Sequence, residues 1–237
     1  MARRKQEKEA LRRERERREA EARAAQQRKR LVGYGAGGVL AIAAIALVVL
    51  LAAGGGDSEG QGGGDVFPEG GSVPEQTQFD IETAAREAGC ELRDTEGSGV
   101  ADHTTSLDER VDYEDNPPTE GRHYQVPAED GLYYEAPADE ALVHSLEHGR
   151  VIVWVKPGLP LQVRETVRAL FDEDEYQMLV VPRRNMEPAV AATAWNRDPE
   201  PGGTGRTLAC PRWDDGVVDA IRTFRDEHRS NGPEAVP

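Results

Sequence analysis

Four of the five histidines in this chain lie close together in the sequence. They are His103, His123, His144 and His148, and the fifth is His228. Neutral imidazole nitrogens bind zinc, copper, nickel and iron. His144 and His148 are four residues apart, so their side chains share a side whether the segment is helical or extended. The cluster predicts a transition-metal site, with copper or zinc as the expected ion.

Other side chains near the cluster could tune this predicted site. The thioether of Met178 or Met186 would add a soft ligand that favours copper. Glu147 stands between the paired histidines, where a carboxylate can cap a helix or hold an imidazole in place. We therefore expect Glu147 to hydrogen-bond to a metal-binding imidazole without binding the metal itself.

The segment from His144 to His148 also reads H-x-x-E-H, the pattern of inverted zinc proteases, in which the glutamate activates a zinc-bound water. That pattern needs a long supporting helix and a third, carboxylate ligand, whereas here Gly149 and a β-rich run follow at once. The sequence does not establish an enzyme. Two alternatives to simple metal binding stay open, namely a scaffold or interaction module with structural histidines, and a zinc hydrolase.

The chain contains two cysteines, Cys90 and Cys210. In an oxidising compartment such a pair is expected to form a disulfide. The bridge would close a loop of about 120 residues, for which the chain-entropy relation gives an upper value of about 5 kcal/mol. A metal-thiolate site is disfavoured because the sequence has no C-x-x-C spacing.

Mixed helices and strands without regular βαβ repeats predict a compact α+β domain. Residues 97–141 show little periodicity, and so long an irregular stretch inside a domain is more often functional than idle. The predicted helices are 81–89, 161–171 and 215–229, and the predicted strands are 150–155, 176–181 and 190–195.

Residues 31–53 contain no charged side chain, and 23 such residues can span a bilayer as a helix. Residues 1–30 hold 13 Lys and Arg against 6 Asp and Glu, and no basic residue follows the span until Arg86. The positive-inside rule then places the N-terminus in the cytoplasm and the C-terminal domain outside. A cleaved signal peptide is the competing interpretation, and it also exports the domain.

The predicted organisation is a basic cytoplasmic arm (1–30), a single transmembrane helix (31–53), a Gly- and Pro-rich linker (54–77) and an extracytoplasmic domain (78–237). The chain has a net charge of −15 although its first 30 residues carry +7, so the rest is strongly acidic. Phosphate recognition needs Lys and Arg, so the acidic charge argues against nucleic acid as a partner of the domain. The membrane is the expected partner of the N-terminal helix, and no protein partner is indicated.

Two motifs resemble the signatures of the DUF3105 family, which consists mostly of bacterial membrane-anchored proteins of unknown function. They are N-P-P-T-E-G-R-H at residues 116–123 and H-S-L-E-H-G at residues 144–149. Glu120 and Arg122 stand where the family usually has Ser and Pro. The resemblance covers about residues 78–235, including Ala194-Trp195 and the closing Gly-Pro-Glu, and it implies a domain and a topology but no activity.

Overall fold

The computed structural model describes residues 66–98 and 102–234. Its helices are α2 (Ile81–Glu87), α3 (Asp139–Glu147), α4 (Leu161–Glu173) and α5 (Gly216–His228). Its strands are β1 (Glu91–Glu96), β2 (Gly131–Leu132), β3 (Val151–Val155), β4 (Met178–Pro182), β5 (Val190–Asn196) and β6 (Thr204–Cys210). These elements confirm the predicted α+β class.

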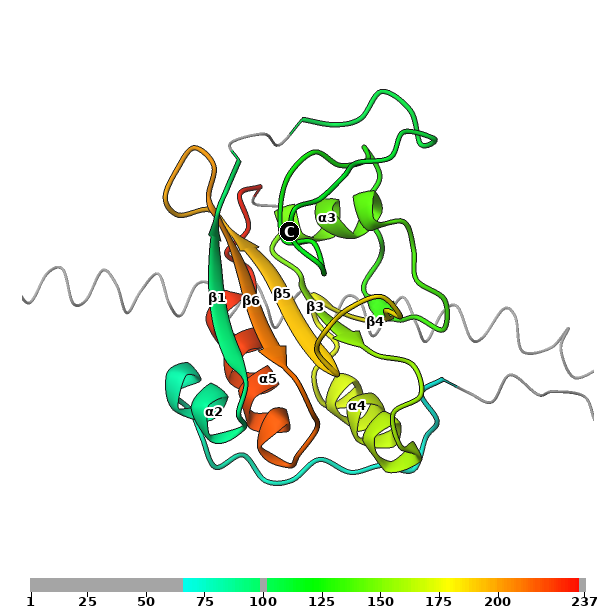
Figure 1. Ribbon diagram of the computed structural model, residues 1–237, viewed down its shortest axis with the longest axis vertical. Helices are drawn as coiled ribbons and strands as arrows, with labels where there is room; N and C mark the ends of the chain where they lie inside the picture. Colours follow the sequence, from blue (N-terminus) through cyan, green and yellow to red (C-terminus); the bar gives the residue numbers. More distant parts are fainter. Residues whose placement is uncertain (1–65, 99–101, 235–237) are drawn as a thin grey trace, which may run out of the picture. The chain divides into compact units, whose positions relative to one another are not determined.

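The strands form one mixed sheet in the order β1-β6-β5-β3-β4-β2 (Figure 1). Strands β1, β6, β5 and β3 pair with their neighbours in antiparallel fashion, whereas β4 pairs in parallel with both β3 and β2. Helix α4 connects the parallel strands β3 and β4.

Alternating side chains of the sheet build two apolar cores. On β3, Val151, Val153 and Val155 face the core that α2, α4 and α5 cover. Ile152 and Trp154 face the second core, which α3 covers. The apolar faces expected for two helices are confirmed as buried: Val163, Val167, Leu170 and Phe171 on α4, and Val217, Ile221 and Phe224 on α5.

The structure adds packed elements that the sequence pattern does not reveal. Strand β1 is polar, mostly exposed and paired only with β6, so it lacks the alternation that marks a half-buried strand. Phe67 is fully buried in the core under α4 and α5, so packing begins before the domain start that we expected near Gln78.

The predicted disulfide between Cys90 and Cys210 is present, with Cα atoms 4.2 Å apart. It lies beside the paired residues Glu91 and Ala209, where β1 begins and β6 ends. The bridge therefore fastens the edge strand β1 to the rest of the sheet.

Within residues 66–98 and 102–234, no helix is long and apolar enough to cross a membrane. The predicted cytoplasmic arm (1–30) and transmembrane helix (31–53) lie outside the described residues, as does most of the predicted linker.

Candidate metal centre

Two of the predicted ligands come from the irregular segment that precedes α3. The backbone N–H of His123 donates to the carbonyl of Asp102 (3.2 Å), and the N–H of Thr104 donates to the carbonyl of His123 (2.7 Å). His103 and His123 thus form a parallel β-bridge, and their ring centroids are 4.9 Å apart. This short pairing brings together two histidines that are far apart in the sequence.

The other two predicted ligands lie at the C-terminal end of α3. His144 is in the last turn, and His148 is the C-cap residue. Their Nε2 atoms are 2.9 Å apart, because residues four apart stack on one side of a helix. Leu142 and Leu146 of α3 are fully buried against the sheet, so packing fixes the direction in which these imidazoles point.

The loop and the helix bring their histidines into one cluster. The His144 ring centroid lies 4.8 Å from that of His123 and 5.0 Å from that of His103. Glu147 joins them, with its Oε2 3.0 Å from His123 Nε2 and 4.0 Å from His144 Nε2. His103, His123, His144 and Glu147 each offer one ligand atom, and these atoms all lie within 4.8 Å of one another.

Glu147 is therefore placed among the potential ligands, whereas the sequence led us to expect it behind them. Its side chain is buried together with those of His123 and His144, and His103 is exposed at the outer edge. A buried carboxylate surrounded by imidazoles is a donor set that suits a divalent transition metal.

The hydrogen bond of the other ring nitrogen determines the state of His123. Its Nδ1 lies 2.7 Å from the carbonyl oxygen of Gly121. A carbonyl can only accept, so Nδ1 carries a proton and Nε2 is the ring nitrogen left to bind another partner. Nε2 is 3.0 Å from the Glu147 carboxylate oxygen. Among the described residues, neither atom has a hydrogen-bond partner of good geometry.

Local electrostatics keep this cluster in a metal-competent ionisation state. Burial, together with the neighbouring His123 and His148, lowers the pKa of His144 to about 4. Burial alone would raise the pKa of Glu147, but contact with His123 and the nearby His144 and His103 lowers it overall. At neutral pH the cluster thus contains an uncharged His144 and an ionised carboxylate, which are the forms that bind metal.

A second group of potential ligands adjoins the first and shares two of its members. It comprises His144, Glu147, His148 and Glu234. Glu234 Oε2 lies 3.2 Å from His148 Nε2. Sequence reasoning missed Glu234, and the only signal that pointed to it is the closing Gly-Pro-Glu of the family resemblance.

Backbone contacts hold Glu234 at this place. Its N–H donates to the carbonyl of Glu147 (3.1 Å), and the N–H of Ser230 donates to the carbonyl of Gly149 (2.8 Å). Gly232 lies so close to the end of α3 that a Cβ atom there would be 2.2 Å from the carbonyl oxygen of Glu147. We call residues 230–234 the C-terminal strap.

The sulfur-containing residues of the described part of the chain lie elsewhere. Met178 is fully buried in the core under α4 and α5, and Met186 packs among apolar residues of the second core. Cys90 and Cys210 are joined to each other. The donors that the structure brings together are therefore imidazole nitrogens and carboxylate oxygens.

Trp195, at the end of β5, closes the inner side of the cluster. Its ring packs edge-on against His123 with a centroid distance of 6.1 Å. The indole N–H donates to the carbonyl of Gly202 (3.1 Å), which fixes the ring in this position. The buried indole of Trp195 thus borders His123, whereas His103 is exposed to solvent.

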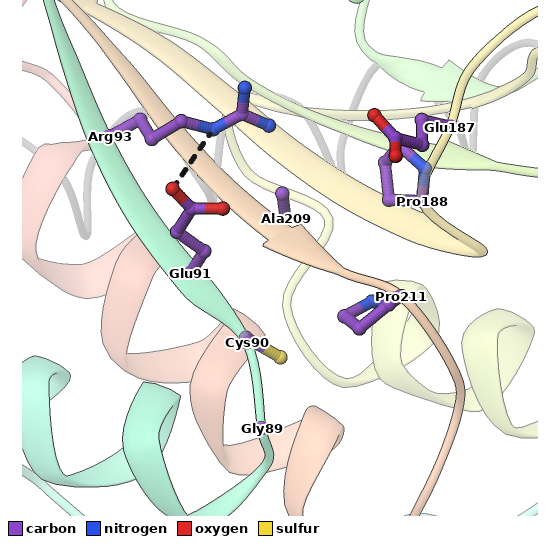
Figure 2. A pocket seen from close by; sticks show the side chains of 8 residues that line it. All are labelled: Gly89, Cys90, Glu91, Arg93, Glu187, Pro188, Ala209 and Pro211. Carbon is purple, nitrogen blue, oxygen red and sulfur yellow. Dashed lines mark ion pairs between the residues drawn. The ribbon is translucent and has the colours of Figure 1, made fainter.

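A cleft of about 280 Å³ lies beside the disulfide, away from the histidines (Figure 2). Figure 2 shows the Glu91–Arg93 ion pair of β1 on one side and Pro188 and Pro211 on the other. None of the residues that line this cleft is a histidine. It is therefore separate from the metal centre.

Comparison with known families agrees with the two motifs. The family model "Protein of unknown function (DUF3105)" matches residues 104–236. This range includes His123, His144, Glu147 and His148, and it begins directly after His103. No curated protein and no solved structure shows significant similarity to the chain.

Proposed function

This chain belongs to the DUF3105 family, whose function is unknown, and we propose that it binds a divalent transition metal outside the cytoplasmic membrane. The ligands are His103, His123, His144 and Glu147, which offer four atoms within 4.8 Å of one another. The sequence also suggested His148 as a ligand of this ion, and Glu147 takes that place in our proposal.

The approach of His123 to Glu147 carries this proposal. His123 Nε2 and Glu147 Oε2 lie 3.0 Å apart in a buried position, and neither atom has a hydrogen-bond partner of good geometry among the described residues. Such an approach is unfavourable unless a proton or a cation lies between the atoms. Tetrahedral zinc with bonds of roughly 2.0–2.1 Å places its ligand atoms about 3.3 Å from each other, which is close to this spacing.

The chemistry of the donors favours zinc as the ion. Imidazole and carboxylate are common zinc ligands, whereas the thioethers that would favour copper pack in the apolar cores. Copper(II), which also accepts nitrogen and oxygen ligands, is the second candidate.

The disulfide supports the location in our proposal. Disulfides persist in oxidising compartments and are rare in the cytoplasm, so the bridge between Cys90 and Cys210 favours an exported domain. We propose that residues 31–53 anchor this domain to the membrane with the N-terminus in the cytoplasm. The acidic character of the domain suits an exposed position, where charge maintains solubility.

The interaction module is the second interpretation. It predicts histidines that are scattered or engaged in structural hydrogen bonds, whereas four histidines lie in one cluster here. Large apolar side chains that are exposed, such as Phe79 and Leu107, belong to neither core. The zinc hydrolase interpretation stays a prediction. It would require Glu147 to activate a water molecule instead of binding the metal.

Metal content of the purified full chain tests the proposal. After incubation with zinc or copper(II) and removal of excess metal, mass spectrometry should find near-stoichiometric metal. Glu147→Gln and His144→Gln should reduce the affinity by more than the roughly 10–100-fold that loss of a ligand's supporting partner produces. The control is His228→Gln, because His228 lies on α5 outside the cluster.

Either of two results contradicts the proposal. One is the absence of bound metal in the unaltered chain after incubation with both ions. The other is equal metal retention in Glu147→Gln, His144→Gln and the His228→Gln control. The interaction module would then be the preferred interpretation of the domain.

A further inference from the structure

We propose that the cluster holds a second metal ion, bound by His148, Glu234 and Glu147, and that Glu147 bridges the two ions. This inference rests on the proposed function, since it extends the same site. It assigns a role to the C-terminal strap, which the first ion does not require.

The division of donors into two groups points to two ions. The first group contains His103 and His123, the second contains His148 and Glu234, and both include His144 and Glu147. A neutral imidazole has one free lone pair, so His144 can bind one ion only. A carboxylate has two oxygens, so Glu147 can bind one ion with each. Glu147 is thus the residue that can serve both positions.

His148 needs an ion or a proton of its own. Its Nε2 is 2.9 Å from His144 Nε2 and 3.2 Å from Glu234 Oε2, and its side chain is only 12% exposed. When His144 directs its Nε2 lone pair to the first ion, the His148 lone pair remains beside it. A second cation next to His148 satisfies that lone pair and the Glu234 carboxylate together.

The backbone places Glu234 there even though its side chain is 55% exposed. An exposed glutamate usually moves freely in solvent, but the Glu234 N–H is bound to the carbonyl of Glu147 and the strap is packed against Gly149. Because the backbone is already anchored, metal binding has to order only the side chain of Glu234, which lowers the entropic cost. The strap therefore serves to deliver a carboxylate to the end of α3.

The charge of the donors suits two ions. Paired metal ions in proteins lie about 3.5–4 Å apart, and anionic ligands between them offset their repulsion. Glu147, whose exposed fraction is only 6%, supplies such a ligand. The second ion would have three protein ligands, which leaves a coordination position for water. Because Glu234 is exposed, this is the ion that solvent can reach.

Zinc stoichiometry of the full chain tests this inference. Titration with zinc, followed by native mass spectrometry, should show two ions per unaltered chain and one ion in both Glu234→Gln and His148→Gln. Glu227→Gln is the matched control, because Glu227 is an exposed glutamate near the end of α5. Circular dichroism should confirm that the variants remain folded.

A second readout uses copper(II). Two bridged copper(II) ions couple magnetically, so the unaltered chain should show a weak electron paramagnetic resonance signal for its copper content. Glu234→Gln should show the full signal of one isolated ion.

The outcomes separate this inference from the proposed function. One zinc in the unaltered chain, or two in both Glu234→Gln and His148→Gln, would overturn the second ion while leaving the first intact. No zinc in the unaltered chain would overturn the proposed function, and the second ion with it.

Discussion

At the scale of single residues, the state of His123 determines what the site can do. The Gly121 carbonyl accepts a hydrogen bond from Nδ1 of His123, so Nε2 is the ring nitrogen directed at Glu147. The position of Gly121 depends on its φ of +113°, a backbone conformation that glycine adopts readily. A turn residue thus selects the tautomer that a metal ligand requires.

This arrangement predicts opposite effects of one substitution on stability and on metal binding. Glu147→Gln replaces a carboxylate oxygen with an amide that can donate to His123 Nε2. The metal-free variant should be more stable than the unaltered chain by about 1 kcal/mol, the usual net value of a hydrogen bond. Urea unfolding in the presence of a chelator measures this difference. A less stable variant would mean that Glu147 already has a proton-sharing partner.

His228 predicts how stability depends on pH outside the metal centre. Burial and the nearby Arg206 lower the pKa of His228 to about 4, against about 6.5 in an unfolded chain. Between these values the unfolded chain binds more protons, so this contribution to stability is complete above pH 6.5 and is lost as the pH falls toward 4.

The change from pH 7 to pH 5 should reduce the free energy of unfolding by up to about 2 kcal/mol through His228. His144 titrates in the same direction, so the contribution of His228 is the difference between the unaltered chain and His228→Gln. Urea unfolding at both pH values measures it. Identical pH dependence of the two chains would contradict the assignment.

At the scale of elements, much of the site follows from local sequence and the rest follows from pairing. The spacing of His144 and His148 predicts their contact, because one end of α3 carries both. The meeting of His103 with His123 depends on a β-bridge within an irregular segment, for which no periodic pattern exists. Glu234 reaches His148 through contacts of the strap with Gly149, which lies far away in the sequence.

The fold shows the same division. Strands β3, β4 and β5 are apolar and buried, so their sequences predict them. Strand β1 forms because β6 offers a free edge and Cys90 is bonded to Cys210, and neither cause appears in the polar sequence of β1 itself.

The disulfide should contribute strongly to stability at this edge. Cys90→Ala combined with Cys210→Ala should lower the free energy of unfolding by about 2–4 kcal/mol, because the bridge restricts a long loop of the unfolded chain. Urea unfolding of the variant and of the unaltered chain under non-reducing conditions measures this loss. An unchanged midpoint would show that β1 is held by other contacts.

The strap should depend on the absence of a side chain at Gly232. Gly232→Ala places a Cβ atom 2.2 Å from the Glu147 carbonyl oxygen, so the strap must move away from α3. We expect this variant to bind one zinc ion in place of two. Gly131→Ala is the control, because a Cβ atom there meets only Tyr133 at 4.0 Å. Two ions in Gly232→Ala would show that the strap adapts or does not supply a ligand.

At the scale of the whole molecule, the two motifs that resemble the DUF3105 signatures meet at one cluster. The loop motif supplies His123, the helix motif supplies His144 and Glu147, Trp195 covers His123, and the strap supplies Glu234. Segments that are separate in the sequence thus meet around a single centre. This convergence supports the metal-binding role that we propose.

The membrane anchor that we propose predicts the location of the whole chain in cells. The full chain should be recovered with membranes, and removal of residues 31–53 should release it. Protease added to spheroplasts or protoplasts should digest the C-terminal domain and spare the basic N-terminal arm. Protection of the domain from protease would reverse the proposed orientation.

In our proposal a metal ion lies between His123 and Glu147. Anomalous X-ray diffraction from crystals of the zinc-loaded protein, recorded at the zinc absorption edge, tests it most directly. We expect a peak roughly 2.0–2.2 Å from both His123 Nε2 and Glu147 Oε2. A peak elsewhere with these two atoms still facing each other, or no peak in the cluster, would contradict it.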